Sequence, residues 1–164
     1  MENRVAGNRK ATSKAMRGLS ALALLLIMLC LTNVASAELG GSLSSVQSDR
    51  EYFNGNDQVT HAGAYDIHRI TTAAGSNIRE YVSPDGKVFA VGWSSAGHPD
   101  MRQLLGAYFE QYQRALQNPR KGRGPLAIHD PGLVVELGGH SRAFTGRVYV
   151  PELVPQGIDL GDIR

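Results

Sequence analysis

The sequence has little cysteine: Cys30 is the only one among 164 residues, and it lies in an apolar stretch near the N-terminus. A lipoprotein signal requires a small residue directly before its cysteine, and Leu29 is large. If this N-terminal segment is removed, the remaining chain has no thiol, which excludes disulfides, thiolate metal sites and a cysteine nucleophile. The stability of the folded part must then come from its core.

The sequence also lacks a long hydrophobic run. Its most apolar stretch, Leu19–Leu31, is shorter than the roughly 20 residues that a membrane-spanning helix needs. Basic side chains precede this stretch, and the small residues Ala35–Ala37 follow it. We therefore predict a cleavable signal peptide over residues 1–37, with cleavage after Ala37 and with Met16 as an alternative start.

An excess of charge of one sign is missing as well. The formal net charge is +2, but five of the 17 Lys and Arg side chains and one of the 15 acidic side chains precede residue 38. Cleavage therefore leaves a slightly acidic domain of roughly 127 residues, enough for a single core. This charge balance does not favour a nucleic-acid partner. We expect no cofactor and no stable membrane anchor after cleavage.

The first part of the exported chain contains few signals of regular structure. Residues 38–63 predict a flexible leader with a possible short helix at Ser44–Phe53 and a turn at Asn54–Asp57. Segments rich in β-branched and aromatic residues follow, separated by turn residues such as Pro84-Asp85-Gly86. They predict an antiparallel meander with strands at 64–72, 76–83 and 87–94.

A helix is expected next. Asp100 is a suitable N-cap, and Gln103 completes a capping box. Apolar residues recur at three- and four-residue steps from Met101 to Leu116, so the periodicity predicts one amphipathic helix that ends before Pro119.

The last part of the chain predicts three more strands, at 126–129, 133–137 and 142–150, with a hairpin turn at 138–141. The expected fold is α+β: an antiparallel sheet of about six strands (β-β-β-α-β-β-β) with one amphipathic helix packed on one face. The α+β domain covers residues 64–155, and residues 156–164 form a polar tail.

Candidate site residues are few. The histidines are not spaced as metal ligands, so we expect no metal site. His140 beside Ser141, and His98 beside Asp100, are weak candidates for catalysis, because a serine–histidine pair needs mutual contact and an orienting group. A hairpin turn at His140 and a helix cap at Asp100 are the simpler interpretations.

The sequence also contains a basic cluster and several aromatic residues that could lie at the surface. Arg120, Lys121 and Arg123 form a basic loop that suits an anionic surface or a solvated connection. Trp93 is the one aromatic residue expected at the surface, whereas Tyr108, Phe109 and Tyr112 are expected in the core.

Several phrases occur together in the exported part of the chain: 79–91 (REYVSPDGKVFAV), 99–106 (PDMRQLLG), 132–136 with Gly138-Gly139-His140, and Leu153-Val154-Pro155. As a set they resemble the exported bacterial family filed as domain of unknown function 2844, over about residues 39–163. The resemblance implies a Gram-negative source, export and a single small domain. It implies no activity, cofactor or catalytic residue.

We therefore expect an exported protein, periplasmic or extracellular, that acts as a non-enzymatic binding or accessory domain. Its partner would be an envelope protein or a cell-surface component. Two alternatives stay open: an envelope hydrolase that uses His140 with Ser141 or His98 with Asp100, and a chaperone-like protein that binds peptides at a sheet edge.

Overall fold

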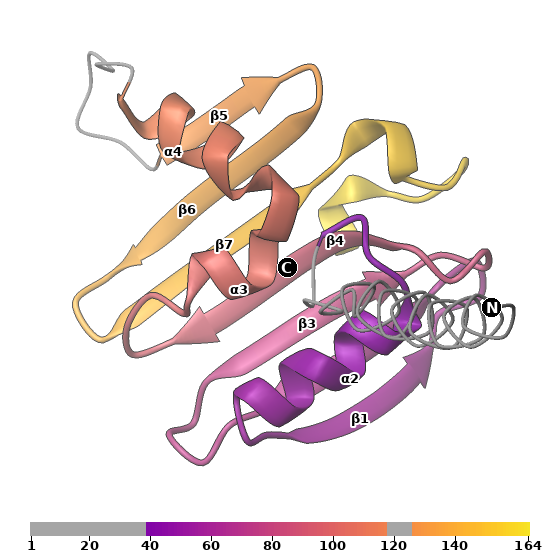
Figure 1. The fold of residues 1–164 in the computed structure, drawn as a ribbon, viewed down its shortest axis with the longest axis horizontal. Helices are drawn as coiled ribbons and strands as arrows, with labels where there is room; N and C mark the ends of the chain where they lie inside the picture. The colour runs from indigo at the N-terminus through magenta and orange to yellow at the C-terminus, as the bar shows by residue number, and fades with distance from the viewer. Residues whose placement is uncertain (1–38, 118–125) are drawn as a thin grey trace, which may run out of the picture. The chain divides into compact units, whose positions relative to one another are not determined.

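The structure is a computed structural model that describes residues 39–117 and 126–164 (Figure 1). The expected signal peptide, its cleavage site at Ala37, Cys30 and the basic loop lie outside the described residues. The helices are α2 (Leu43–Tyr52), α3 (Met101–Leu105) and α4 (Phe109–Gln117), with 3-10 turns η1 (Gly106–Tyr108), η2 (Pro151–Leu153) and η3 (Leu160–Asp162). The strands are β1 (Asn56–His61), β2 (Asp66–Thr71), β3 (Asn77–Val82), β4 (Val88–Ser95), β5 (Leu126–Asp130), β6 (Leu133–His140) and β7 (Ala143–Tyr149).

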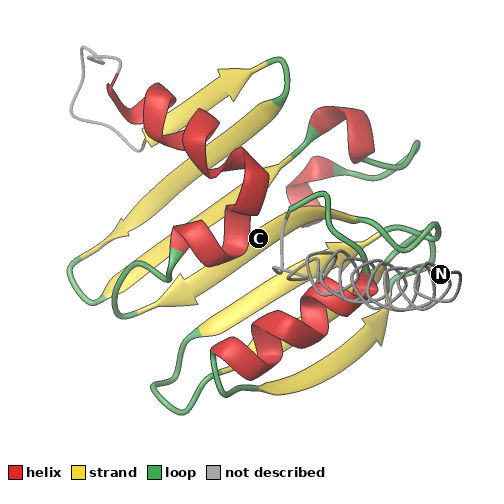
Figure 2. Cartoon of the chain, viewed as in Figure 1, coloured by secondary structure: helices red, strands yellow, loops and turns green. Residues whose placement is uncertain are grey.

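The strands form one antiparallel sheet of seven strands in the order β1-β2-β3-β4-β7-β6-β5 (Figure 2). Strands β1 to β4 form one meander and β5 to β7 form a second, and the two meet where β7 pairs with β4. This confirms the α+β class. The strand beyond the six expected is β1, which lies in the segment predicted as a leader; its side chains are mostly exposed, so it has no apolar alternation.

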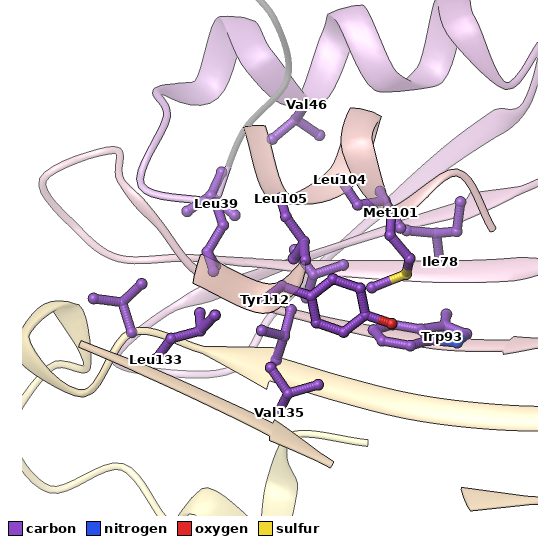
Figure 3. Packing of buried hydrophobic residues seen from close by; sticks show 14 of the residues in the cluster. Leu39, Val46, Ile78, Trp93, Met101, Leu104, Leu105, Tyr112, Leu133 and Val135 are labelled. Atoms are coloured by element: carbon purple, nitrogen blue, oxygen red, sulfur yellow. The ribbon is translucent and has the colours of Figure 1, made fainter. Parts of the chain in front are cut away.

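The three α-helices lie over one face of this sheet and bury the larger core with it. Ile78 and Trp93 point from the strands toward Leu104, Leu105 and Tyr112 of the helical side (Figure 3). Trp93 is 1% exposed, so the expectation that it lies at the surface is wrong. It fits because it faces Gly146 on β7, where any added side chain would overlap the Trp93 ring.

The single helix predicted over residues 101–116 is interrupted. At Gly106 the backbone has φ 47° and ψ −117°, a conformation essentially restricted to glycine, and it separates α3 from η1 and α4. The helical periodicity of the apolar residues continues through this break, which explains why the sequence predicted one helix. The break lets α3 and α4 take different directions over the sheet (Figure 1).

The opposite face of the sheet is also covered. Tyr81, Phe89, Ala90, Val134 and Tyr149 form a second core with Ile163, which is completely buried. Each of these strand residues has a sequence neighbour in the larger core, as expected of a sheet buried on both faces. Phe89 and Ala90 are adjacent and both lie in the second core, because the register of β3 and β4 shifts there. The segment predicted as a polar tail therefore packs on the sheet through Ile158 and Ile163, between polar residues that remain exposed.

The segment predicted as a leader is likewise part of the fold. The possible helix expected at 44–53 is present as α2, and Val46 enters the larger core from it. The hairpin turn expected at 138–141 is shorter than predicted, because β6 continues to His140 and Arg142 adopts φ 68° in the turn itself.

Candidate functional site

The structure places His140 and Ser141 at the exposed tip of the β6–β7 hairpin. The Nδ1 atom of His140 lies 3.3 Å from the backbone oxygen of Ser141. The contact therefore involves the Ser141 backbone and not its hydroxyl group. The two residues are therefore neighbours in a turn, and no acidic side chain orients the imidazole among the described contacts.

His98 and Asp100 lie in the loop before α3 and serve different contacts. The His98 ring stacks on Phe144 with 4.5 Å between ring centroids. Asp100 is the N-cap of α3: its Oδ1 accepts hydrogen bonds from the backbone N–H of Arg102 at 2.9 Å and of Gln103 at 3.2 Å. This confirms the predicted cap.

Asp100 also contacts α2, which sequence reasoning did not foresee. The Tyr52 hydroxyl donates to Asp100 Oδ2 at 2.7 Å. This hydrogen bond, followed by those from the α3 backbone, lowers the pKa of Asp100 although partial burial opposes the shift. The Gln103 side chain does not close the predicted capping box, because its amide donates to Asp49 Oδ1 at 2.8 Å. Asp100 thus helps to join α2 to α3.

The most buried titratable groups lie beneath α2. Asp49 on α2 and Glu80 on β3 are 2% and 1% exposed and hydrogen-bond to each other. Burial raises the pKa of Asp49 to about 6, against the opposing effect of its hydrogen bonds with Glu80 and Gln103. Burial, the hydrogen bond with Asp49 and the nearby charges raise the pKa of Glu80 well above its ordinary value. The raised pKa values of both groups favour a proton shared between the two carboxyl groups.

A histidine–aspartate pair lies next to this acid pair. His68 on β2 faces Glu80 across the β2–β3 ladder, and its Nδ1 lies 2.9 Å from Asp57 Oδ2 on β1. His68 and Asp57 line a pocket of about 340 Å³ under Leu43, Gln47 and Arg50 of α2. The pair belongs to the packing of α2 on the first two strands.

The opposite face carries a row of arginine side chains. Arg69, Arg79, Gly92, Arg147 and Glu136 are successive cross-strand neighbours from β2 to β6. We call Arg69, Arg79 and Arg147 the arginine row. Like charges directly opposite each other across a ladder are unfavourable, and Arg69 faces Arg79 in this way. Among the described residues, neither of these two arginines forms an ion pair with an acidic side chain.

The C-terminal segment fills the gap that Gly92 leaves in this row. A side chain at Gly92 would overlap the backbone carbonyl of Arg164. Arg79 Nε donates to that oxygen at 2.6 Å, and the Tyr81 hydroxyl lies 3.2 Å from it. Arg147 holds the same segment, because its Nη1 donates to the backbone oxygen of Ile163 at 3.0 Å. Gly92 therefore lets the tail dock against the arginine row.

A pocket of about 440 Å³ opens beside this docked segment. Its lining combines the charged side chains with small residues of β6 and β7: Arg79, Glu136, Leu137, Gly138, Thr145, Gly146, Arg147, Ile163 and Arg164. We call it the arginine pocket. A Cβ atom at Gly138 would meet only Thr145 Oγ1, at 3.6 Å, so the missing side chain at Gly138 leaves open space here.

One carboxylate balances part of this positive charge. Arg147 Nε and Nη2 both lie 2.9 Å from Glu136 Oε2. Arg147 lowers the pKa of Glu136 against the opposing effect of burial, and His129 adds to the lowering, so Glu136 is charged at neutral pH. The arginine pocket therefore contains three guanidinium groups, the Glu136 carboxylate and, at Arg79, the main-chain oxygen of Arg164.

Sequence reasoning missed this site because its residues come from three strands and the C-terminal segment. The sequence offered one indication of the site, the polar residues Arg79 and Arg147 within apolar strands. Taken separately, each of them indicates only the solvent-facing side of a sheet. The register of the sheet and the docking of Arg164 bring them together.

In residues 39–117 and 126–164, no group of three or more His, Cys, Asp or Glu side chains is arranged to hold a metal ion. Over the same residues, no helix combines the length and the apolar character that crossing a bilayer requires.

Comparison with known proteins identifies one family. The model of a family described as "Protein of unknown function (DUF2844)" matches residues 35–163. No curated protein and no solved structure matches the chain.

Proposed function

The chain belongs to the DUF2844 family, and we propose that it is an exported, non-enzymatic binding domain of the cell envelope that holds an acidic envelope component in the arginine pocket. The observation that carries this proposal is the convergence of Arg79, Arg147 and Arg164 on one open pocket. Guanidinium groups offer several N–H donors in a planar arrangement that matches carboxylates and phosphates.

The electrostatics of the sheet face support an anionic ligand. Arg69 and Arg79 face each other, and a bound anion would offset their repulsion. Glu136 neutralises Arg147 but not Arg79 or Arg164. A ligand with negative charge would therefore bind at the end of the pocket where the tail docks, beside the main-chain oxygen of Arg164 that Arg79 already binds.

Export is supported by the pattern of residues 1–37. A basic segment, a short apolar run and small residues before position 38 are typical of a cleaved signal peptide. Cleavage after Ala37 would release the part of the chain that forms the sheet, and would place the arginine pocket among the acidic polymers and lipids of the envelope.

The envelope-hydrolase alternative gains no support from the positions of its four candidate residues. Asp100 is committed to capping α3 and to Tyr52. His140 contacts the Ser141 backbone, and His98 stacks on Phe144.

The proposal is tested in two steps. Cells that express the full chain are fractionated, and we expect a processed protein beginning at Glu38 in the exported fraction, whereas Ala37→Lys should leave it unprocessed. The protein purified from that fraction is then passed over immobilised envelope polysaccharide. Gly138→Leu should abolish retention because it fills the pocket, whereas Gly97→Leu should not, since a side chain there meets nothing. Retention that Gly138→Leu leaves unchanged would overturn the proposal.

A second candidate function is favoured by the edge of the sheet. In the described chain β1 pairs only with β2, and Val59 on β1 and Leu43 on α2 are 48% and 52% exposed. An unpaired edge with apolar side chains beside it suits addition of an extended peptide as a further strand. If so, Val59→Asp should reduce binding of unfolded polypeptide, and Leu116→Asp, at an exposed leucine of α4, should not. Equal binding by both variants would argue against this function.

A further inference from the structure

We propose that the arginine pocket is specific for a sugar acid, a hydroxylated ring that carries one carboxylate. This inference rests on the proposed function and names the chemistry of its ligand. It follows from the division of the pocket into a cationic end and a polar end that accepts hydrogen bonds.

The cationic end consists of Arg79 and Arg164. Arg79 uses its Nε to bind the Arg164 backbone oxygen, and Arg164 uses its own Nε to bind the Gly161 oxygen at 3.3 Å. These contacts orient both guanidinium groups. In the described structure the terminal nitrogens of both have no hydrogen-bond acceptor, so they remain available to a ligand carboxylate.

Arg147 has a different role, as a positioning residue. Its Nε and Nη2 bind Glu136, and its Nη1 binds the backbone of the tail at Leu160 and Ile163. Its donors are therefore used within the protein. Arg147 fixes Glu136 on one side and the C-terminal segment on the other, and so sets the width of the pocket.

The polar end is formed by Glu136 and Thr145. Arg147 donates to Glu136 Oε2, whereas the nearest charged partner of Glu136 Oε1 is His129 Nε2, at a distance of 3.6 Å. A charged carboxylate that keeps an acceptor position suits a neutral hydroxyl donor. It also repels a second negative charge on the ligand, which disfavours a dianionic phosphate relative to a carboxylate.

The size of the pocket agrees with a small ligand of this kind. Its volume of about 440 Å³ lies near the lower end of the range for small-molecule sites, which is roughly 300 to 1,000 Å³. The floor at Gly138 has no side chain, so a ring can approach the β6 backbone closely.

Isothermal titration of the exported, processed protein with three probes tests the ligand class. The probes are glucuronate, glucose and glucose 6-phosphate. We expect glucuronate to bind at least about tenfold more tightly than either other probe, because a hydrogen-bonded charge pair typically contributes a factor of this size. Arg79→Met should abolish the preference for glucuronate over glucose.

Matched variants keep the test independent of folding defects. Arg69→Met removes a charge from the arginine row but not from the pocket lining, so it should leave glucuronate affinity within about twofold. Arg79→Lys keeps the charge and loses the planar group, and should weaken glucuronate about tenfold or more. Circular dichroism of each variant checks that the fold is retained.

The outcomes separate this inference from the proposed function. Equal binding of glucose and glucuronate, or tighter binding of glucose 6-phosphate, would overturn the sugar-acid specificity. Absence of binding to all three probes, together with envelope retention that Gly138→Leu abolishes, would also overturn it and leave the proposed function standing. Envelope retention that survives Gly138→Leu would refute the proposed function itself.

Discussion

Asp49 and Glu80 form a hydrogen-bonded acid pair in the interface between α2 and β3, where both side chains are almost completely buried. Gln103 of α3 donates to the same Asp49 carboxylate. A buried acid pair thus lies where α2, α3 and the sheet meet. The packing of α2 on the sheet therefore depends on pH.

The first prediction concerns this pH dependence. Both carboxyl groups have raised pKa values in the folded state, so the folded protein binds more protons than the unfolded one and loses stability as pH rises. The free energy of unfolding should fall from about pH 4 through the Asp49 pKa of about 6, and continue to fall above it as the Glu80 contribution is lost. Each group contributes up to about 1.4 kcal/mol per pH unit. Urea denaturation at pH 4.5, 6 and 8 measures the profile.

Glu80→Gln is the matched variant for that profile. The amide keeps a donor to Asp49 and removes the cost of the buried acid, so the variant should be more stable than the wild type at pH 8. The difference should shrink at pH 4.5. A wild-type stability that is flat between pH 4.5 and 8 would contradict the shared proton.

The second prediction concerns the break between α3 and α4. Gly106→Ala should lower the free energy of unfolding by about 1–3 kcal/mol, because the φ of 47° at Gly106 is unfavourable for any residue with a Cβ atom. Gly97→Ala, in an exposed bend without positive φ, is the control and should change stability by less than about 0.5 kcal/mol. Equal effects in urea denaturation would show that the break is not required.

The third prediction uses two glycines of the β6–β7 ladder. Gly146→Ala should destabilise the protein by about 1–3 kcal/mol, because its Cβ would overlap the buried ring of Trp93. Gly138→Ala, on the opposite face, should be tolerated, since its Cβ would only approach Thr145. Trp93 is the only tryptophan, so its emission maximum reports the change directly. We expect an emission maximum at short wavelength in the wild type and in Gly138→Ala. In Gly146→Ala we expect the maximum at longer wavelength.

The fourth prediction tests the docking of the C-terminal segment. Ile163→Ala should cost about 2–4 kcal/mol because Ile163 is completely buried in the second core, with Tyr81 and Phe89. Leu160→Ala, in the same segment but 36% exposed, should cost well under half as much. Thermal unfolding compares the two variants. If both are as stable as the wild type, the tail does not contribute to the second core.

Local sequence patterns predicted much of the fold, but they did not predict strand β1 or the buried position of Trp93. The alternation in Phe89, Val91 and Trp93 predicted β4, and the steps from Met101 to Tyr112 predicted helix. The same pattern did not reveal β1, because a strand that pairs on one edge and exposes most of its side chains has no apolar period. It also placed Trp93 at the surface, because the space for its ring comes from Gly146 on a strand far along the chain.

The sequence by itself determined the family and the α+β class, since each depends on residues close together in the chain, and it predicts export on the same kind of local pattern. Only the tertiary structure decided that both faces of the sheet are covered, that Asp49 meets Glu80, and that Arg79, Arg147 and Arg164 line one pocket. The physical reason is that strand order and register place side chains beside each other across the sheet. No local preference of a residue encodes which distant residue will be its neighbour.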